Sequence, residues 1–438
     1  MNSKYPLIRI LPVALIALTT FLSVLSYSAN AFSFPNAQAG RVNVDEMAER
    51  DVFTMEEWAY SCGVQVVDGF ELTSEDGYDY SVRTNSDVPA GSPVVAVPSQ
   101  MILSSLQAWQ DLGDNALLQA EQQLIEAKLD HTLPLFRLFV KILIEYEKGP
   151  ESPWFPWLNS LPRFYNTGAS MTYACFDCLP PYAAGLAMQE RVQSVNFQKA
   201  ATFLPMMSED TTTDRDLLKW AYNVAVTRSV EWNGERLIAP MADMFNHGTN
   251  PEAYVTYDKD MNCMVYAAKD TLAGSPLRIS LGDPTNPSPL FATYGFLDET
   301  CPASFCKLMH MQDEMKELGY DFSNLLFYKD TGEISMETYD VVLYSILLKN
   351  DPSLAQEFYQ AVTTGDEATK NQFHEQYFSY TKEELQKHVD DTLRKLEGWS
   401  SKAQSYDPTT HPRVPVILGH NAFVKQTFMK VKQNLDNM

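Results

Sequence analysis

The stretch Leu237–Asn250 reads LIAPMADMFNHGTN, and its central part sets three polar side chains among large apolar ones. The polar residues are Asp243, Asn246 and His247, and polar groups buried in such surroundings must be hydrogen-bonded. Asparagine and histidine together offer donors and acceptors, which suits them either to read an adenine ring or to hold a tight crossing of two loops. For an isolated pair, a satisfied core histidine beside an Asx turn is the commoner arrangement, so the rest of the chain must decide.

The segment upstream adds a charged residue in an apolar setting. Helical spacing of apolar residues predicts a helix over about Asp214–Val230. Arg228 follows Val224 by four residues and Ala221 by seven, which places it on the apolar face of that helix. A guanidinium there is costly unless it meets acceptors. Arg228 therefore either belongs to a site or is a long side chain that reaches water from the helix end.

Hydrophobic periodicity divides the chain into four parts in the order β, α, β, α. Short β-branched runs from Phe53 to Pro98 indicate strands, and strands and turns return from Leu237 to Tyr294. A helical segment of about residues 103–230 separates them and includes a helix that ends near Lys148. After Cys306 the spacing predicts helices over residues 336–348, 353–362, 382–396 and 419–434.

One local pattern occurs twice. Asp87–Val97 reads DVPAGSPVVAV, and Asp270–Ser280 reads DTLAGSPLRIS. Each has an acidic residue, an Ala-Gly-Ser-Pro turn and a strand that leads away from it. The repeat suggests two halves of one sheet system on either side of the helical segment, although such turns are common.

The order of the motifs resembles that of SET-domain protein methyltransferases, in the class typified by the Rubisco large-subunit lysine methyltransferase. Asp243-Met-Phe-Asn-His247 is preceded by Thr227-Arg228-Ser229 and followed by an Ala-Gly-Ser turn, a strand and Tyr294-Gly-Phe296. The other matching residues are Ser152-Pro-Trp154, Trp157, Leu161-Pro162, Pro240 and Asn286. The resemblance covers about Phe53–Leu308.

The resemblance implies an α+β protein. Its SET-domain β fold would contain a pseudoknot and occupy residues 51–308, with the long helical insertion at about 103–230. Residues 309–438 would form an all-α C-terminal domain similar to the substrate-binding domain of the class.

The implied activity is transfer of a methyl group from S-adenosylmethionine to a lysine of a protein substrate. The lysine would enter a narrow channel from the face opposite the cofactor, so that catalysis rests on alignment and on a polar collar. The cofactor-binding positions carried over are Arg228, Asp243, Asn246, His247 and Phe296. The channel positions are Tyr254, Leu281 and Tyr294, with Tyr294 as the catalytic residue.

Two departures from the class leave the activity open. The class has a Gly-x-Gly turn near its amino end, where this chain has the single Gly77. Leu281 stands where the class has a tyrosine whose hydroxyl lies beside the transferring methyl group, and a positioned group of that kind contributes on the order of 100-fold in rate. The alternatives are therefore a lysine methyltransferase that relies on Tyr294, a silent SET-fold protein that binds a peptide or the cofactor, and a methyltransferase for another side chain such as histidine.

Charge and the first residues bear on partners and location. The net charge of −23 disfavours nucleic-acid binding. Lys4 and Arg9 precede the apolar run Leu11–Leu25, and Ala29-Asn30-Ala31 suits a signal peptidase, so residues 1–31 are expected to be a signal peptide that leaves no membrane anchor. Residues 32–50, which begin with a phenylalanine, would be a transit segment or linker. The destination is either a plastid of the complex type or a secreted or lumenal compartment.

The six cysteines do not indicate a metal site. Cys175 and Cys178 form a CxxC, but no second CxxC completes a four-thiolate zinc site. Buried thiols, or one or two disulfides, are the simpler expectation.

Overall fold

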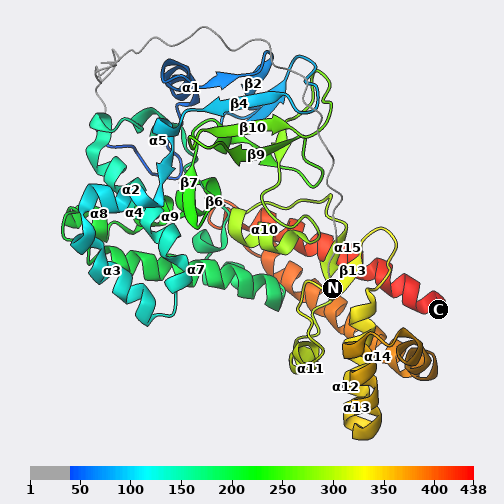
Figure 1. Ribbon diagram of the computed structural model, residues 1–438. Helices are drawn as coiled ribbons and strands as arrows, with labels where there is room; N and C mark the ends of the chain where they lie inside the picture. Colours follow the sequence, from blue (N-terminus) through cyan, green and yellow to red (C-terminus); the bar gives the residue numbers. More distant parts are fainter. Residues whose placement is uncertain (1–39) are drawn as a thin grey trace. The chain divides into compact units, whose positions relative to one another are not determined.

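The computed structural model describes residues 40–438 (Figure 1). The expected signal peptide and the first part of the segment 32–50 lie outside the described residues and stay predictions. Residues 41–50, in contrast, pack against the domain, since Val42 is buried in the main core. Within residues 40–438 no helix is long and apolar enough to cross a membrane.

A four-stranded antiparallel sheet joins the two β parts of the sequence. Its order is β1-β4-β10-β9, so that strands from before and after the helical insertion pair directly. Alternate residues of β10 are buried, which fits the period of two expected for a strand with one face on the core. The strands are β1 Gln65–Val66, β4 Pro93–Val97, β9 Ala253–Tyr257 and β10 Cys263–Ala267.

The two repeated Ala-Gly-Ser-Pro segments pair with each other, which fits the suggestion that they belong to one sheet system. Val88 and Thr271 form an antiparallel bridge. The Asp87 carboxylate accepts from the Ala273 amide at 2.8 Å, and the Asp270 carboxylate accepts from the Ala90 amide at 2.8 Å. Each acidic residue therefore caps the turn of the other copy.

Two short parallel strands form the chain crossing that corresponds to the expected pseudoknot. β8, Asn246–His247, runs parallel to β11, Arg278–Ile279. The Gly248 amide continues the ladder and donates to the Ile279 carbonyl at 2.9 Å. Two smaller sheets flank the crossing: β2 Phe70–Thr73 with β3 Ser81–Thr84, and β5 Leu103–Ser104 with β7 Glu235–Ile238 and β6 Val230–Trp232.

The helical insertion packs on the sheets through an aromatic core. Phe136 of α4 and Phe197 of α7 lie with ring centroids 5.2 Å apart, in an edge-to-face arrangement. The expected helix at Asp214–Val230 is α9. The insertion helices are α2 Ser105–Leu112, α3 Asp114–Glu126, α4 Leu133–Lys148, α5 Phe155–Ser160, α6 Tyr173–Phe176, α7 Pro181–Ala201, α8 Glu209–Thr213 and α9 Arg215–Arg228.

Two segments read as strand or turn are helices. α1, Val52–Ser61, begins at Asp51, whose side chain accepts from the Thr54 amide. α10, Pro287–Tyr294, begins at Asn286 and ends at Gly295, which has φ +81°. In both segments the composition, rich in turn-forming or β-branched residues, favoured a strand or a turn. The capping residues nevertheless stabilise a helix there.

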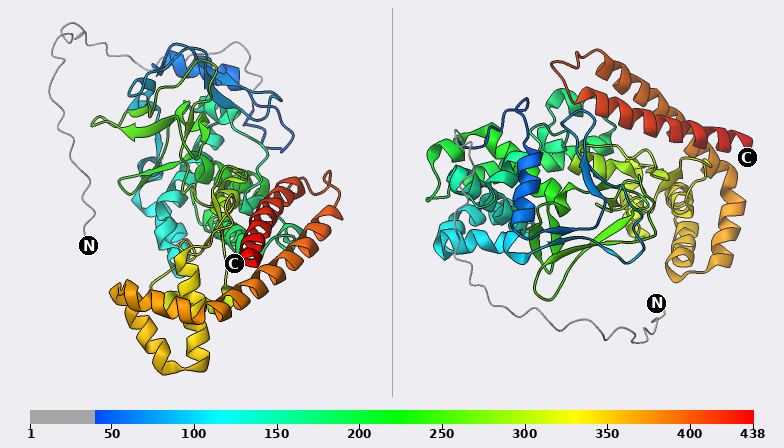
Figure 2. Two further views of the ribbon diagram at one scale, coloured as in Figure 1. Left: turned by 90° about the vertical axis from the view of Figure 1, so that its right-hand side faces the viewer. Right: turned by 90° about the horizontal axis from the view of Figure 1, so that it is seen from above.

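The C-terminal region is helical, as expected, and has its own core. A short pair, β12 Ala303–Phe305 with β13 Leu326–Tyr328, spans the expected boundary at residue 308. The long helices α14 and α15 contact each other along the tail (Figure 2). The helices are α11 Gln312–Glu317, α12 Met336–Asn350, α13 Pro352–Thr364, α14 Glu367–Gln404 and α15 Val414–Asn437.

Candidate functional site

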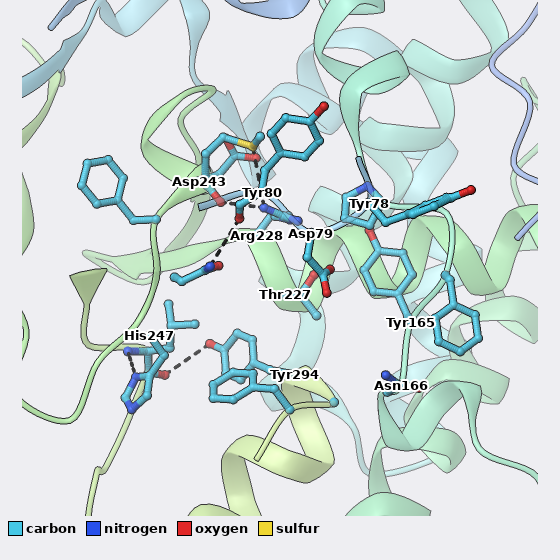
Figure 3. A pocket seen from close by; sticks show the side chains of 18 of the residues that line it. Tyr78, Asp79, Tyr80, Tyr165, Asn166, Thr227, Arg228, Asp243, His247 and Tyr294 are labelled. Atoms are coloured by element: carbon cyan, nitrogen blue, oxygen red, sulfur yellow. Dashed lines mark hydrogen bonds between the residues drawn. The ribbon is translucent and has the colours of Figure 1, made fainter. Parts of the chain in front are cut away.

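A cavity of about 970 Å³ opens beside the crossing of β8 and β11 (Figure 3). Its wall combines the end of α9, the loop between β2 and β3, the segment 162–166 and the end of α10. Seven of the residues singled out in the sequence line it: Arg228, Asp243, Asn246, His247, Leu281, Tyr294 and Phe296.

Arg228 meets acceptors rather than reaching for solvent. It is the last residue of α9, and its Nη1 donates to the Asp243 carbonyl at 2.7 Å (Figure 3). The helix C-terminus is a favourable place for a cation. This bond also fixes the 3-10 turn Ala242–Met244, which follows the strained Met241 at φ +73°.

Asp243 holds a buried carboxylate that is only half satisfied. Its Oδ2 accepts from Trp157 Nε1 at 3.0 Å, whereas its Oδ1 has no hydrogen-bond partner among the described residues. Burial raises the pKa of Asp243, and the nearby Arg228 guanidinium opposes that shift. A buried oxygen without a partner on a cavity wall is where a ligand donor fits.

Two further polar residues of the wall escaped the sequence analysis. Arg50 donates from Nε to the Ser160 carbonyl at 2.7 Å and lies 5.0 Å above the Tyr80 ring. Burial and, secondarily, repulsion by Arg228 lower the pKa of Arg50 to about 10. The buried Tyr165 hydroxyl has no partner among the described residues, and burial raises its pKa. Nothing in the local sequence marks either residue, because tertiary packing alone brings them to Arg228.

His247 locks the crossing. Its Nδ1 accepts from the Leu281 amide at 3.1 Å, so Nε2 carries the proton and lies 3.3 Å from Asp298 Oδ2. Burial lowers the pKa of His247, and the Asp298 carboxylate opposes that shift. The ring also packs against Phe296, with centroids 5.7 Å apart.

Asn246 precedes His247 on the same short strand, and its side chain lies on the opposite face. Asn246 is exposed, and its Nδ2 donates to the Tyr80 carbonyl at 3.3 Å. It thereby ties the crossing to the loop between β2 and β3. That loop lines the cavity although it contains a single glycine, Gly77. Its turn is stabilised by the Asp76 side chain, which accepts from the Tyr78 and Asp79 amides at 2.7 and 2.9 Å.

Tyr294 and Leu281 meet at one side of the cavity. The Tyr294 hydroxyl donates to the Leu281 carbonyl at 3.3 Å (Figure 3). Burial raises the pKa of Tyr294, so its hydroxyl stays protonated at neutral pH. The Leu281 side chain contributes an apolar surface to the cavity wall, where the sequence resemblance leads us to expect a tyrosine hydroxyl.

Tyr254, expected in the channel, does not line the cavity. Tyr254 is 50% exposed and stacks on Tyr266 at a centroid distance of 5.8 Å, away from the cavity. Its neighbours Val255 and Tyr257 line the wall instead. Because successive side chains of β9 point to opposite faces, an assignment shifted by one residue selects the wrong face.

The cysteines take the first of the two expected states, that of buried thiols. All six are free thiols, and five of them are buried. No group of three or more His, Cys, Asp or Glu side chains that could hold a metal ion occurs in residues 40–438.

Solved structures of one class share this fold. The structure of Rubisco LSMT bound to AdoMet aligns with a TM-score of 0.59 and 13% identity, over 89% of this chain and 92% of that one. The SET domain of LSMT bound to lysine and AdoHcy aligns with a TM-score of 0.56 and 12% identity, over 88% and 91%. The chain therefore has the α+β SET-domain fold of the LSMT type, with a helical insertion and a helical C-terminal region, as the sequence predicted.

Two curated proteins are similar in sequence. The actin-histidine N-methyltransferase of Drosophila melanogaster is 26% identical over 273 residues, which cover 55% of this chain and 48% of that protein. The actin-histidine N-methyltransferase of Danio rerio is 26% identical over 250 residues, 52% and 39% of the two chains. The chain thus matches less than half the length of each relative. No family model matches it.

Proposed function

We propose that this protein is an S-adenosylmethionine-dependent methyltransferase that acts on a nitrogen of a protein side chain. The observation that carries the proposal is the cavity beside the crossing, where Arg228 and Asp243 lie at one side and Tyr294 at another (Figure 3). The Tyr294 hydroxyl donates to the Leu281 carbonyl there. The solved structures that share the fold are bound to AdoMet, AdoHcy or sinefungin, which supports the same cofactor class here.

The residues of the cavity fit this cofactor. Arg228 and Arg50 would face its carboxylate, since both carry guanidinium groups on the wall. Asp243 Oδ1, Tyr165 Oη and Asn166 Oδ1 have no hydrogen-bond partner within residues 40–438, and a ligand would supply partners for them. Phe296 and His247 would pack beside the adenine. The cofactor supplies a methyl group activated on a sulfonium sulfur, and the protein orients the acceptor nitrogen and excludes water.

Two observations favour histidine over lysine as the acceptor. Leu281 removes the hydroxyl that would help to orient an amine, and the curated relatives are named for methylation of histidine in actin. An imidazole has an ordinary pKa of about 6.5 and is mostly neutral at pH 7, whereas a lysine amine with a pKa of about 10.4 must first lose a proton. An apolar wall at Leu281 therefore suits an imidazole better. Lysine, the acceptor that the fold class implies, is the second candidate.

The pH dependence of transfer separates the two acceptors. With purified actin as the histidine-containing probe and Rubisco as the lysine-containing probe, labelled methyl transfer is measured from pH 5.5 to 9.5. For an imidazole acceptor we expect kcat/KM to rise through about pH 6.5 and then stay level. For an amine it should climb about tenfold per pH unit up to about pH 10. S-adenosylmethionine binding without transfer to either probe, or to plastid or secretory-pathway extract, would support the silent alternative.

Asn246→Ala tests the assignment of the crossing to the cofactor. Removing the bond to the Tyr80 carbonyl frees the loop between β2 and β3 that lines the cavity. The loss of about 1 kcal/mol expected for one hydrogen bond corresponds to roughly a fivefold weaker S-adenosylmethionine affinity by calorimetry. Asn250→Ala, at an exposed position beyond the crossing, is the matched control. Equal affinities for both variants and the wild type would show that Asn246 is misassigned.

A further inference from the structure

The segment just before α1 forms part of the cavity wall. Glu46, Met47, Ala48 and Arg50 all line the cavity. The segment is held at one end by Val42, which is buried in the core, and at the other by the Asp51 amide, which donates to the Asn159 carbonyl at 3.1 Å. The site is therefore built partly from residues that the sequence assigned to a linker.

The loop before α15 reaches the same wall from the far end of the chain. Thr409 and Pro412 line the cavity, and Arg413 follows directly. Arg413 is 8% exposed, and its Nη2 donates to Glu46 Oε1 at 2.6 Å. This ion pair joins the segment before α1 to the start of the last helix.

Arg413 makes two more contacts, both with the segment that leads from Phe164 to Asn166. Its Nε donates to the Tyr165 carbonyl at 2.9 Å, and its guanidinium carbon lies 4.7 Å above the Phe164 ring. A single guanidinium thus holds two cavity-lining segments at a fixed separation, which suits the planar fork of arginine better than the ammonium of lysine.

The held segment in turn abuts the catalytic end of the cavity. A Cβ atom on Gly295 would lie 2.6 Å from the Asn166 carbonyl carbon and 2.7 Å from the Thr167 nitrogen. Gly295 is thus packed directly on this backbone, between Tyr294 and Phe296. A shift of the segment at Tyr165 and Asn166 must therefore disturb the residues on either side of Gly295.

We propose that Arg413 is a positioning residue of the site, and that the clasp formed by Arg413, Glu46 and the Phe164–Tyr165 backbone holds the cavity wall closed around S-adenosylmethionine. The proposal rests on the proposed function. It assigns the start of the C-terminal helix a role in retaining the cofactor, in addition to any role of the tail in binding the protein substrate.

The test measures the dissociation rate of S-adenosylmethionine from the full chain by stopped-flow tryptophan fluorescence, with the affinity by calorimetry and the midpoint of thermal unfolding. In Glu46→Gln the partly exposed acid loses its charge but keeps its shape. In Arg413→Lys the charge remains and the fork is lost. We expect each variant to release the cofactor about tenfold faster, because a wall segment that has lost its ion pair opens more often and product or cofactor release depends on such opening.

Lys219→Gln is the matched control. Lys219 Nζ lies 3.6 Å from Glu46 Oε1 but does not line the cavity, so its loss should leave the dissociation rate unchanged. Higher salt should speed release from the wild type more than from Glu46→Gln. If Arg413→Lys fails to fold, the dissociation rate of Glu46→Gln alone still tests the proposal.

The outcomes separate this proposal from the proposed function. If the wild type does not bind S-adenosylmethionine, both fail. If the wild type binds and Glu46→Gln releases the cofactor no faster, the clasp is wrong and the cofactor site stands. If the thermal midpoint falls in both clasp variants while the dissociation rate is unchanged, the contacts only stabilise the fold.

Discussion

Replacing Arg228 by methionine is expected to weaken S-adenosylmethionine binding by at least about 100-fold, which corresponds to about 2.7 kcal/mol. Methionine keeps much of the length of the side chain but removes the donor to the Asp243 carbonyl and the charge on the cavity wall. A hydrogen bond made by a charged group contributes about 1.5–3 kcal/mol, so the expected loss is within the usual range.

The loss has two sources, and both act on the same wall. The turn Ala242–Met244 would lose the bond that holds it next to Met241, whose φ of +73° needs support from its surroundings. The Asp243 carboxyl would also lose a nearby positive charge that opposes the rise of its pKa, so its neutral form would become more populated. The affinity is measured by calorimetry at pH 7.5.

Arg215→Met is the matched control for this prediction. Arg215 is exposed at the opposite end of the same helix α9, so its loss tests the helix and the net charge without touching the cavity. Arg215→Met should bind as the wild type does. Equal affinities for Arg228→Met and Arg215→Met would show that the cofactor does not use this cavity.

The crossing and its flanks could be predicted from sequence because the signals there are local. The polar residues at Asp243, Asn246 and His247 stand out against apolar neighbours, and Arg228 stands out on the apolar face of a regular helix. The turns after Asp87 and Asp270 also stand out in the sequence, because the same Ala-Gly-Ser-Pro pattern occurs twice. In the structure each aspartate caps the turn of the other copy. A pattern that repeats or breaks a period can be read without knowing the fold.

The rest of the site depends on packing between segments far apart in the chain. No hydrophobic periodicity singles out Arg50, Tyr165 or Arg413 in the sequence. Arg413 binds Glu46, which lies 367 positions away in the sequence. Tyr254 shows a different limit, because the side-chain direction on a strand reverses with every residue and the sequence did not fix the register of β9. The register follows from pairing with β10, which brings Val255 and Tyr257 to the cavity.

The helical tail shows why the ends of a helix are harder to predict from sequence than its existence. The helix expected over residues 382–396 exists but extends over Glu367–Gln404 in α14. The part of α14 before residue 382 has only two buried residues among those described, Phe373 and Thr381, so the apolar stripe that marks a packed helix is weak there. Asp366 starts the helix by accepting from the Thr369 amide, a signal of one residue only.

Replacing Leu281 by tyrosine is expected to shift the acceptor preference from histidine towards lysine by at least about 100-fold in the ratio of kcat/KM values. Leu281 is partly buried on the cavity wall, and its own carbonyl already accepts from the Tyr294 hydroxyl. A tyrosine would add a second hydroxyl beside the first and restore the polar group that orients an amine, whereas its bulk would narrow the space for an imidazole. The ratio is measured by labelled methyl transfer to Rubisco and actin in parallel.

Leu281→Phe separates the two effects, since it adds the ring without the hydroxyl. If steric exclusion alone drives the shift, both variants should lose transfer to actin and neither should gain transfer to Rubisco. If the hydroxyl matters, only Leu281→Tyr should gain transfer to lysine, with the affinity for S-adenosylmethionine unchanged in both. A wild type that already methylates Rubisco faster than actin would contradict the preference for histidine. In that case Tyr294, whose hydroxyl lies 3.3 Å from the Leu281 carbonyl, would have to supply the amine-orienting group alone.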